Sequence, residues 1–340
     1  MSFKIVVYLF TLLNFFFSPI LYGINDRTGI LVIGNNAVDR VFFTDQPYAA
    51  NGKRIASAMQ VYYGGQAANV AYTLASLSEG KVTYVGVFGT DDDSATGRQL
   101  LKNVGVDVNE LVINSCSNTA SIIVNTQTGD RYVTFYPAIS TNLKNNVEYE
   151  SFVSMQREKN FDHVSYIYSD CRLYSLSKAI FEAAMKKQIP VVLDVEIVNN
   201  QTKELINYSD YLITNESVIR ELSGQTDLKK ALEIVAKNFQ LKGAVATLGA
   251  DGYIAFHTSE SNEDNRIIVG SGIKVWAQDA TGAGDAFHAA FIAALANNMS
   301  FASALQFANF VASEKVKCQG PRLEVPRLKN LRKEFENSVT

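Results

Sequence analysis

The stretch DATGAGDAFHAAF at residues 279–291 decides the fold, because it places two glycines between a strand-like run and an apolar helix. The strand-like run is predicted over residues 267–276. Glycines let the backbone curl so that successive N–H groups point at one spot, and the start of the helix adds its positive dipole end. The turn is therefore predicted to bind an anion such as a phosphate.

Asp285 falls in the first turn of that helix, beside any anion bound there. A carboxylate is a poor phosphate ligand but can accept the proton of an attacking hydroxyl. We therefore predict that Asp285 is a catalytic base. The residues alone leave open a second interpretation, in which this acid only stabilises the helix N-terminus by about a few tenths of a kcal/mol.

A second glycine turn, GGQAAN at residues 64–69, follows the extended residues 60–63 and opens another helix. Asn69 lies about one turn into it, where its amide can donate to and accept from sugar hydroxyls. Asp39, just past the first predicted strand, can bind a polyol in the same way. For both sites a purely structural turn remains the alternative.

The composition narrows the class of protein. With 340 residues, 47% of them apolar and 19% charged, the chain is typical of a globular enzyme. Its formal charge of −3 argues against a nucleic-acid partner. No P-loop or dinucleotide glycine motif occurs. The three cysteines lack C-x-x-C or metal-ligand spacing, so they are predicted to be small buried side chains in a reducing compartment.

The N-terminus is unusual, because residues 5–22 are almost continuously apolar after a single Lys4. Residues 1–28 are predicted to be a hydrophobic extension: a signal-like segment, an anchor, or upstream codons included by a mis-set start. Membrane association is expected only if this segment belongs to the mature protein. The remainder predicts a cytoplasmic enzyme.

From Gly29 onward, short β-branched runs alternate with amphipathic stretches. This rhythm predicts a mostly parallel sheet covered on both faces. The predicted segments are 30–34, 65–78, 82–88, 97–104, 163–168, 173–187, 190–195, 211–214, 227–238 and 243–248.

Two extended, alternating segments break this rhythm, at about residues 40–63 and 120–136. The second contains Thr128-Gly129-Asp130, which favours a hairpin turn. We predict that they form a small sheet that covers the ligand crevice as a lid. The alternative is that they are edge strands of one mixed sheet.

The two glycine motifs, in this order and about two-thirds of the chain apart, resemble the two signatures of the PfkB, or ribokinase-like, family of carbohydrate kinases. The resemblance implies a Rossmann-like three-layer αβα fold with a small β-sheet lid, over a kinase domain at about 29–330. It also implies transfer of the ATP γ-phosphate to a sugar hydroxyl, with Mg²⁺ bridging the ATP phosphates.

Carried over residue by residue, the resemblance implies a role for each matching position. Asp285 is the base, and the anion hole comprises Gly282, Ala283 and Gly284. The sugar contacts are Asp39, Gly65 and Asn69, and the ATP contacts are Asn215, Thr247, Gly249, Gly252 and Asn309. Asp279 and Thr281 match positions near a monovalent-cation site, which is occupied by K⁺ in members that use it.

One position departs from the family pattern: Val218 stands where the family's N-x-x-E segment has its glutamate. Glu216 could substitute for it, magnesium could be held differently, or activity could be reduced. The chain also resembles the branch containing sulfofructose kinase and ketohexokinase. Lys53 and Arg172 match two residues that bind an anionic sugar, although Phe135 replaces an expected asparagine. The alternative is that both are solvated surface charges, and ketohexose, ribose and a nucleoside remain open as substrates.

Two other functions stay open. Tyr62, Tyr63 and Phe135 could form a base pocket under the lid, which would favour a nucleoside kinase. Val218 motivates a catalytically weak sugar- or nucleotide-binding protein, although the retained Asp285 counts against it. The sequence leaves open the sugar, the hydroxyl and the oligomeric state; family analogy suggests a homodimer formed through the lid.

Overall fold

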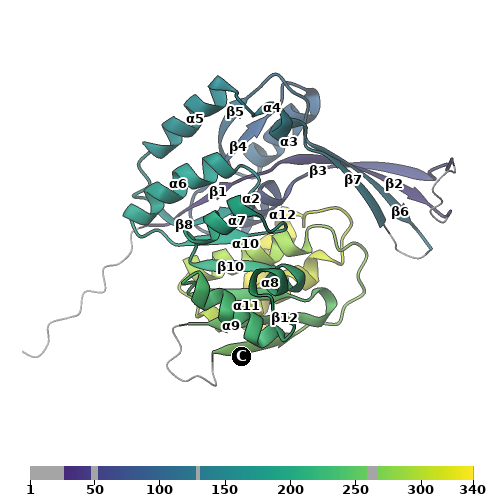
Figure 1. The fold of residues 1–340 in the computed structure, drawn as a ribbon. Helices are drawn as coiled ribbons and strands as arrows, with labels where there is room; N and C mark the ends of the chain where they lie inside the picture. Colours follow the sequence, from purple (N-terminus) through teal and green to yellow (C-terminus); the bar gives the residue numbers. More distant parts are fainter. Residues whose placement is uncertain (1–26, 47–52, 128–130, 259–265, 340) are drawn as a thin grey trace, which may run out of the picture.

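The computed structural model describes residues 27–46, 53–127, 131–258 and 266–339, and within these ranges the main sheet has nine strands (Figure 1). The strand order is β13-β12-β11-β10-β9-β8-β1-β4-β5. Neighbours from β5 to β11 are parallel, whereas β12 and β13 are antiparallel. The strands are β1 (Gly29–Ile33), β4 (Val82–Phe88), β5 (Asp107–Val112), β8 (Val164–Ser169), β9 (Val191–Asp194), β10 (Tyr211–Asn215), β11 (Gly243–Thr247), β12 (Gly252–His257) and β13 (Ile267–Ser271).

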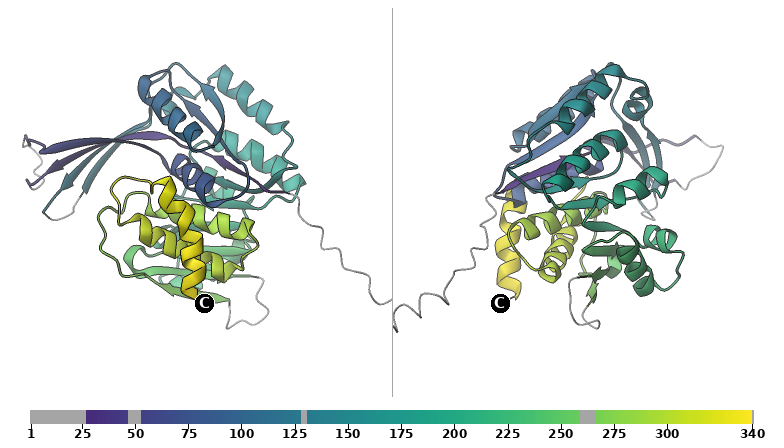
Figure 2. Two further views of the ribbon diagram at one scale, coloured as in Figure 1. Left: turned by 180° about the vertical axis from the view of Figure 1, so that it is seen from behind. Right: turned by 60° about the vertical axis from the view of Figure 1, so that its left-hand side comes forward.

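Helices cover both faces of this sheet, as Figure 2 shows from two sides. The side chains of β1 alternate between two cores, with Ile30 and Val32 in one and Leu31 and Ile33 in the other. A central parallel strand is apolar throughout because it is buried on both sides. The core that contains Ile30 and Val32 includes residues of α2 (Gln66–Leu77), α3 (Asp92–Asn103), α10 (Ala283–Ala296), α11 (Phe301–Lys315) and α12 (Val325–Val339). The core that contains Leu31 and Ile33 includes residues of α4 (Ala138–Asn142), α5 (Val147–Arg157), α6 (Tyr174–Lys186), α7 (Asn200–Ile206), α8 (Glu216–Ser223) and α9 (Leu228–Asn238).

A second, smaller sheet projects from this body (Figure 1). Its order is β3 (Ala58–Gly64), β2 (Ala37–Thr44), β6 (Thr119–Asn125) and β7 (Arg131–Tyr136). The predicted three-layer fold with a small additional sheet is therefore confirmed. The predicted turn at 128–130 and residues 1–26 of the predicted extension lie outside the described residues.

Three local predictions were wrong. The helix predicted at 97–104 begins at Asp92, because the Asp91 side chain accepts a hydrogen bond from the N–H of Ser94 at 3.0 Å and caps it. The strand predicted to reach residue 276 ends at Ser271. Cys116 and Cys318 are exposed rather than buried. Within the described ranges, no helix has the length and apolarity needed to cross a bilayer.

Candidate active site

The glycine turn at the start of α10 has the geometry of an anion site. Gly282 has a left-handed backbone (φ 75°), and a Cβ there would lie 2.1 Å from the carbonyl oxygen of Pro321. The N–H of Ala283 donates to the Ala280 carbonyl at 3.2 Å. Within the described part of the chain, the N–H groups of Gly284 and Asp285 have no acceptor. Two amides at a helix N-terminus are thus available to a ligand.

Asp285 is tied to the other glycine turn by a chain of hydrogen bonds. Asn69 lies 216 residues earlier and donates from Nδ2 to Asp285 Oδ2 at 2.7 Å. Its Oδ1 in turn accepts from Nε of Arg322 at 2.8 Å. Because a guanidinium only donates, Arg322 fixes which side of the Asn69 amide faces the carboxylate. The structure therefore brings the two glycine motifs together.

The surroundings make Asp285 a stronger base than an ordinary aspartate. Burial raises its pKa to about 7; the hydrogen bond from Asn69 opposes this rise and the negative charge of Asp194 adds to it. His288, one turn along α10, acts in the lowering direction. Its ring nitrogens lie 2.7 Å from the carbonyl oxygen of Gly284 and 3.1 Å from that of Ile213. A base whose pKa lies near neutral pH is suited to proton abstraction.

A buried carboxylate, Asp170, fixes the loops around this site. It follows β8 and accepts hydrogen bonds from the backbone N–H of Asn35 (2.8 Å), Ala67 (3.2 Å) and Arg172 (3.0 Å). Burial raises its pKa to about 6, while these N–H groups lower it. One side chain thus joins the loop after β1, the start of α2 and the loop after β8.

A cavity of about 300 Å³ opens at Asp285 and contains most of the predicted sugar contacts. Asp39 lies on β2, and burial raises its pKa to about 6, opposed by Arg322. Arg172 lies at the cavity but is ion-paired with Glu196. Lys53 is exposed and does not line this cavity. The lining residues are Asn35, Ala37, Asp39, Gly65, Gln66, Asn69, Val133, Phe135, Arg172, Glu196, Thr281 and Asp285.

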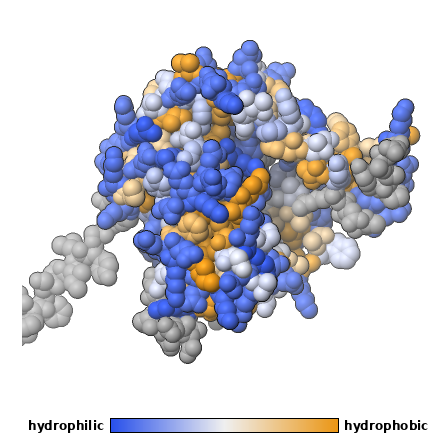
Figure 3. All heavy atoms as spheres, viewed as in Figure 1, coloured by the Kyte–Doolittle hydropathy of each residue, from blue (hydrophilic) through white to orange (hydrophobic). Residues whose placement is uncertain are grey.

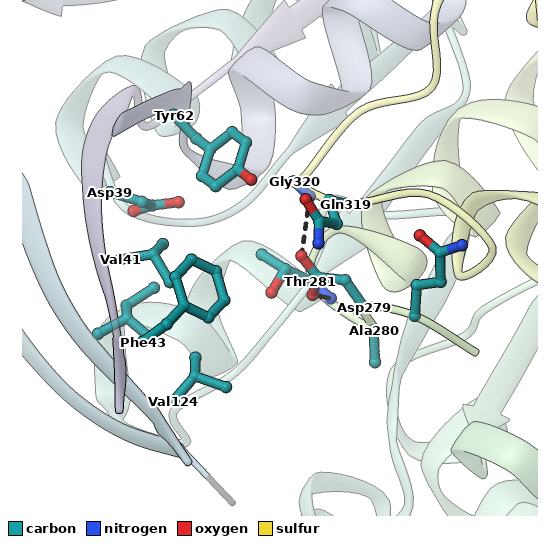
Figure 4. A pocket seen from close by; sticks show the side chains of 12 residues that line it. Asp39, Val41, Phe43, Tyr62, Val124, Asp279, Ala280, Thr281, Gln319 and Gly320 are labelled. Carbon is teal, nitrogen blue, oxygen red and sulfur yellow. Dashed lines mark hydrogen bonds between the residues drawn. The ribbon is translucent and has the colours of Figure 1, made fainter. Parts of the chain in front are cut away.

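A second cavity, of about 400 Å³, lies between the small sheet and the turn before α10 (Figure 4). It shares Asp39 and Thr281 with the first cavity, so the two adjoin. Apolar side chains of the small sheet form one wall. The lining residues are Asp39, Val41, Phe43, Tyr62, Ile122, Val124, Gln278, Asp279, Ala280, Thr281, Gln319 and Gly320.

Four of the predicted ATP contacts lie along one edge of the main sheet. Asn215 ends β10 beside Thr247, which ends β11, and the two are register partners. Gly252, which begins β12, is paired with Ser271, whose carbonyl accepts from Nδ2 of Asn309 at 2.9 Å. Gly249 lies in the turn η1 (Gly249–Asp251), which connects β11 to β12. These residues do not line either cavity above.

Val218, the residue that departs from the family pattern, has a structural role. Val218 is buried in the core, and its N–H donates to the capping side chain of Asn215 at 3.1 Å. Glu216 is exposed and pairs with Arg220 at 3.2 Å. Among the described residues, no group of three or more His, Cys, Asp or Glu side chains is arranged to hold a metal ion.

Comparison with known proteins decides the family. The model of the pfkB family carbohydrate kinases matches residues 27–328. The chain belongs to this family. It is thus an enzyme, a carbohydrate kinase that uses ATP to phosphorylate a sugar, and ribokinase-like relatives share its fold.

Three pfkB-family relatives are similar along nearly their full length. Ribokinase of Haemophilus influenzae is 26% identical over 316 residues, which cover 88% of this chain and 96% of that protein. The structure of Arabidopsis thaliana ribokinase with ribose and ATP is 23% identical (TM-score 0.74), covering 91% of this chain and 99% of that one. Escherichia coli phosphofructokinase-2 with potassium is 20% identical (TM-score 0.72), with coverages of 91% and 99%.

Several residues at the site were missed by sequence reasoning. Asp170, Asp194 and Glu196 each follow or end a strand at the same sheet edge, so the argument applied to Asp39 could have found them. Arg322 and Lys315 could not have been found in this way. They belong to no motif, and only the fold brings them to residues 69 and 279.

Proposed function

We propose that this pfkB-family kinase phosphorylates a ribose- or ketohexose-like sugar at a hydroxyl placed beside Asp285. One observation carries the proposal. The Asp285 carboxylate, whose pKa is raised to about 7, lines a cavity beside the available backbone N–H groups of Gly284 and Asp285. Asp285 accepts the hydroxyl proton, and the sugar oxygen forms a bond to the γ-phosphorus. The bond from that phosphorus to the bridging oxygen breaks, and ADP leaves.

The remaining predicted residues take roles consistent with their positions. Asp39, Gly65 and Asn69 would contact the sugar, because they line the cavity that contains Asp285. Four residues of the sheet edge, Asn215, Thr247, Gly249 and Gly252, would bind ATP together with Asn309 of α11. The amides of the glycine turn would hold the transferred phosphoryl group and its developing charge.

Two observations favour a neutral sugar over the sulfofructose-like substrate suggested by the sequence. Glu196 already pairs with Arg172, and Lys53 is exposed and does not line the cavity. A site for an anionic sugar would instead leave its cations free for the ligand. The relatives named ribokinase support a ribose-like acceptor.

Mg²⁺ would arrive with the ATP phosphates and neutralise their charge. The available oxygen ligands fit this role. Val218 supplies none, but Glu196 lines the cavity together with Asp285, and Asp194, two residues earlier, is the last residue of β9. We therefore propose that Glu196, while it keeps its ion pair with Arg172, and Asp194 behind it would organise the magnesium and its waters.

A nucleoside is a second candidate acceptor, favoured by the apolar second cavity. Phe43 and Tyr62 face this cavity, which adjoins the sugar cavity at Asp39 (Figure 4). A base could occupy it while the ribose reaches Asp285. Tyr63 is directed elsewhere, because its hydroxyl contacts Asp93 at 3.3 Å.

We further propose a cytoplasmic homodimer that forms through the small sheet. This sheet exposes large apolar side chains, and Figure 3 shows hydrophobic residues at the projecting part as well as across the centre of the main body. Such side chains are typical of interaction surfaces. They are Met59, Val61, Tyr132, Val133, Phe135 and Tyr136.

An ADP-release assay against ribose, fructose, sulfofructose and adenosine tests the acceptor. We expect the highest kcat/KM with a neutral sugar, and Lys53→Ala and Arg172→Ala should change KM for neutral and anionic sugars alike. A preference for sulfofructose that these substitutions abolish would contradict the neutral-sugar proposal. A preference for adenosine would select the second candidate.

A further inference from the structure

Lys315, the last residue of α11, is a buried cation that has no carboxylate partner among the described residues. Its side chain is 1% exposed. Its Nζ donates to the backbone carbonyl of Asp279 at 2.9 Å and to that of Cys318 at 3.4 Å. In the described part of the chain, no carboxylate oxygen lies within 4.0 Å of this nitrogen. Lysine is almost never fully buried without an ion pair, so this arrangement calls for a function.

This ammonium lies at the start of the phosphate-binding turn. The N–H groups of Gln278 and Asp279 donate to the carbonyl of Val316 at 2.7 and 3.1 Å. The Asp279 carboxylate accepts from the N–H groups of Thr281 and Gly320, each at 2.8 Å (Figure 4). Lys315 completes this set of contacts. The end of α11 therefore positions the turn that carries the free amides of the site.

The same contacts leave little room for the monovalent cation that the sequence suggested at Asp279 and Thr281. Potassium is bound by rings of carbonyl oxygens that replace its hydration shell. Here the carbonyl of Asp279 already accepts from Lys315, and both carboxylate oxygens of Asp279 accept backbone N–H groups. The residues present therefore do not fit a free potassium ion while Lys315 is in place.

We propose that the ammonium of Lys315 replaces the potassium ion at this site. It carries the same charge, uses the carbonyl oxygens that would bind the ion, and holds the turn in its phosphate-binding conformation. Lys315 is thus a positioning residue, and the enzyme works without added K⁺. The inference rests on the proposed role of this turn in phosphoryl transfer.

Thermal unfolding tests the cation replacement without relying on activity. The melting temperature of the wild type is measured in potassium chloride and in choline chloride at equal ionic strength. We expect equal values for the wild type. For Lys315→Ala, which removes the ammonium and leaves space, we expect a lower value in choline and a saturable, potassium-specific recovery. Lys317→Ala, an exposed neighbour paired with Glu314, is the matched control and should show no such recovery.

The phosphorylation rate provides a second measurement. Loss of the ammonium displaces the turn, and a displacement of about 1 Å can reduce the rate roughly 10²-fold. We expect such a loss for Lys315→Ala in choline, with partial restoration by potassium. Lys315→Met fills the space without charge, so its lost rate should not return with potassium.

Potassium-specific stabilisation or activation of the wild type would overturn the proposal, as would a Lys315→Ala protein that is indifferent to potassium. Should Lys315→Ala fail to fold in both salts, the wild-type comparison alone decides. Should no sugar be phosphorylated, the unfolding experiment still separates this inference from the proposed kinase reaction.

Discussion

The crevice around Asp285 and the small sheet above it are built in opposite ways. In the crevice, polar side chains are buried and linked, as in the series Arg322, Asn69 and Asp285. The small sheet has a fully buried apolar cluster of three residues and exposes large apolar side chains toward solvent (Figure 3). Satisfied buried networks hold side chains in one arrangement, whereas a thinly packed sheet opens at low cost. Under the proposed function, the crevice would fix the chemistry and the small sheet would adapt to the acceptor as a lid.

The largest expected effect comes from Asp285→Asn, which keeps the shape of the crevice and removes the base. We expect kcat to fall by about 10²–10⁴ while ATP affinity changes little. Rapid-quench kinetics and nucleotide titration measure the two quantities. Asp227→Asn, which removes the charge of an exposed helix-capping aspartate, is a control that should retain kcat. Near-normal kcat in Asp285→Asn would remove this carboxylate from the mechanism.

The same variant should be more stable than the wild type at alkaline pH. Burial raises the pKa of Asp285 from 3.8 to about 7, so the folded protein binds this proton more tightly than the unfolded chain. The charged carboxylate therefore destabilises the fold above pH 7, and this cost disappears as the pH falls from 7 toward 4. In urea unfolding, the free energy of unfolding of Asp285→Asn should exceed that of the wild type by on the order of 1 kcal/mol at pH 8. At pH 4 the two free energies should be equal.

The two glycines of the turn should respond differently to alanine. At Gly282 a Cβ would meet the Pro321 carbonyl, whereas at Gly284 no protein atom lies within 4 Å of it. Gly282→Ala should therefore lower both stability and activity. Gly284→Ala should leave the melting temperature unchanged and reduce kcat/KM by roughly 10–10²-fold, because the methyl group enters the phosphate space. Unchanged kinetics in Gly284→Ala would show that the phosphate binds elsewhere.

The pH dependence of kcat/KM should follow the titration of Asp285. Since only the carboxylate accepts a proton, the rate should fall about tenfold per pH unit below pH 7. Asp39, whose pKa burial raises to about 6, would steepen the fall at lower pH. A profile that stays flat down to pH 5 would mean that proton transfer to Asp285 does not limit the reaction.

The smallest effect is expected in the lid. Val133 is 49% exposed and lines the sugar cavity from β7. Val133→Ser should change the free energy of unfolding by less than about 0.5 kcal/mol. It should nevertheless raise KM for the acceptor severalfold. Val112→Ser, at a comparably exposed edge of the main sheet, should leave KM unchanged. Equal KM values for both variants would argue that the lid does not contact the acceptor.

The sequence predicted those features of the fold and of the site that depend on a local residue pattern. Alternating strands and helices predicted the layers, and the two glycine motifs singled out Asp285 as a base and Asn69 as a sugar contact. It did not predict single hydrogen bonds between residues that are far apart in the chain, such as Arg322 to Asn69 and Lys315 to the Asp279 carbonyl. Val218 shows a further limit, because sequence marks a missing glutamate but cannot show that the side chain faces the core.

The most direct test of the account is a crystal structure with a non-hydrolysable ATP analogue and the preferred sugar. We expect the acceptor hydroxyl at about 2.6–3.2 Å from an Asp285 carboxylate oxygen. The terminal phosphate should accept from the N–H groups of Gly284 and Asp285, which have no acceptor among the described residues. A terminal phosphate bound away from this turn, with Asp285 out of reach of the sugar, would contradict the account.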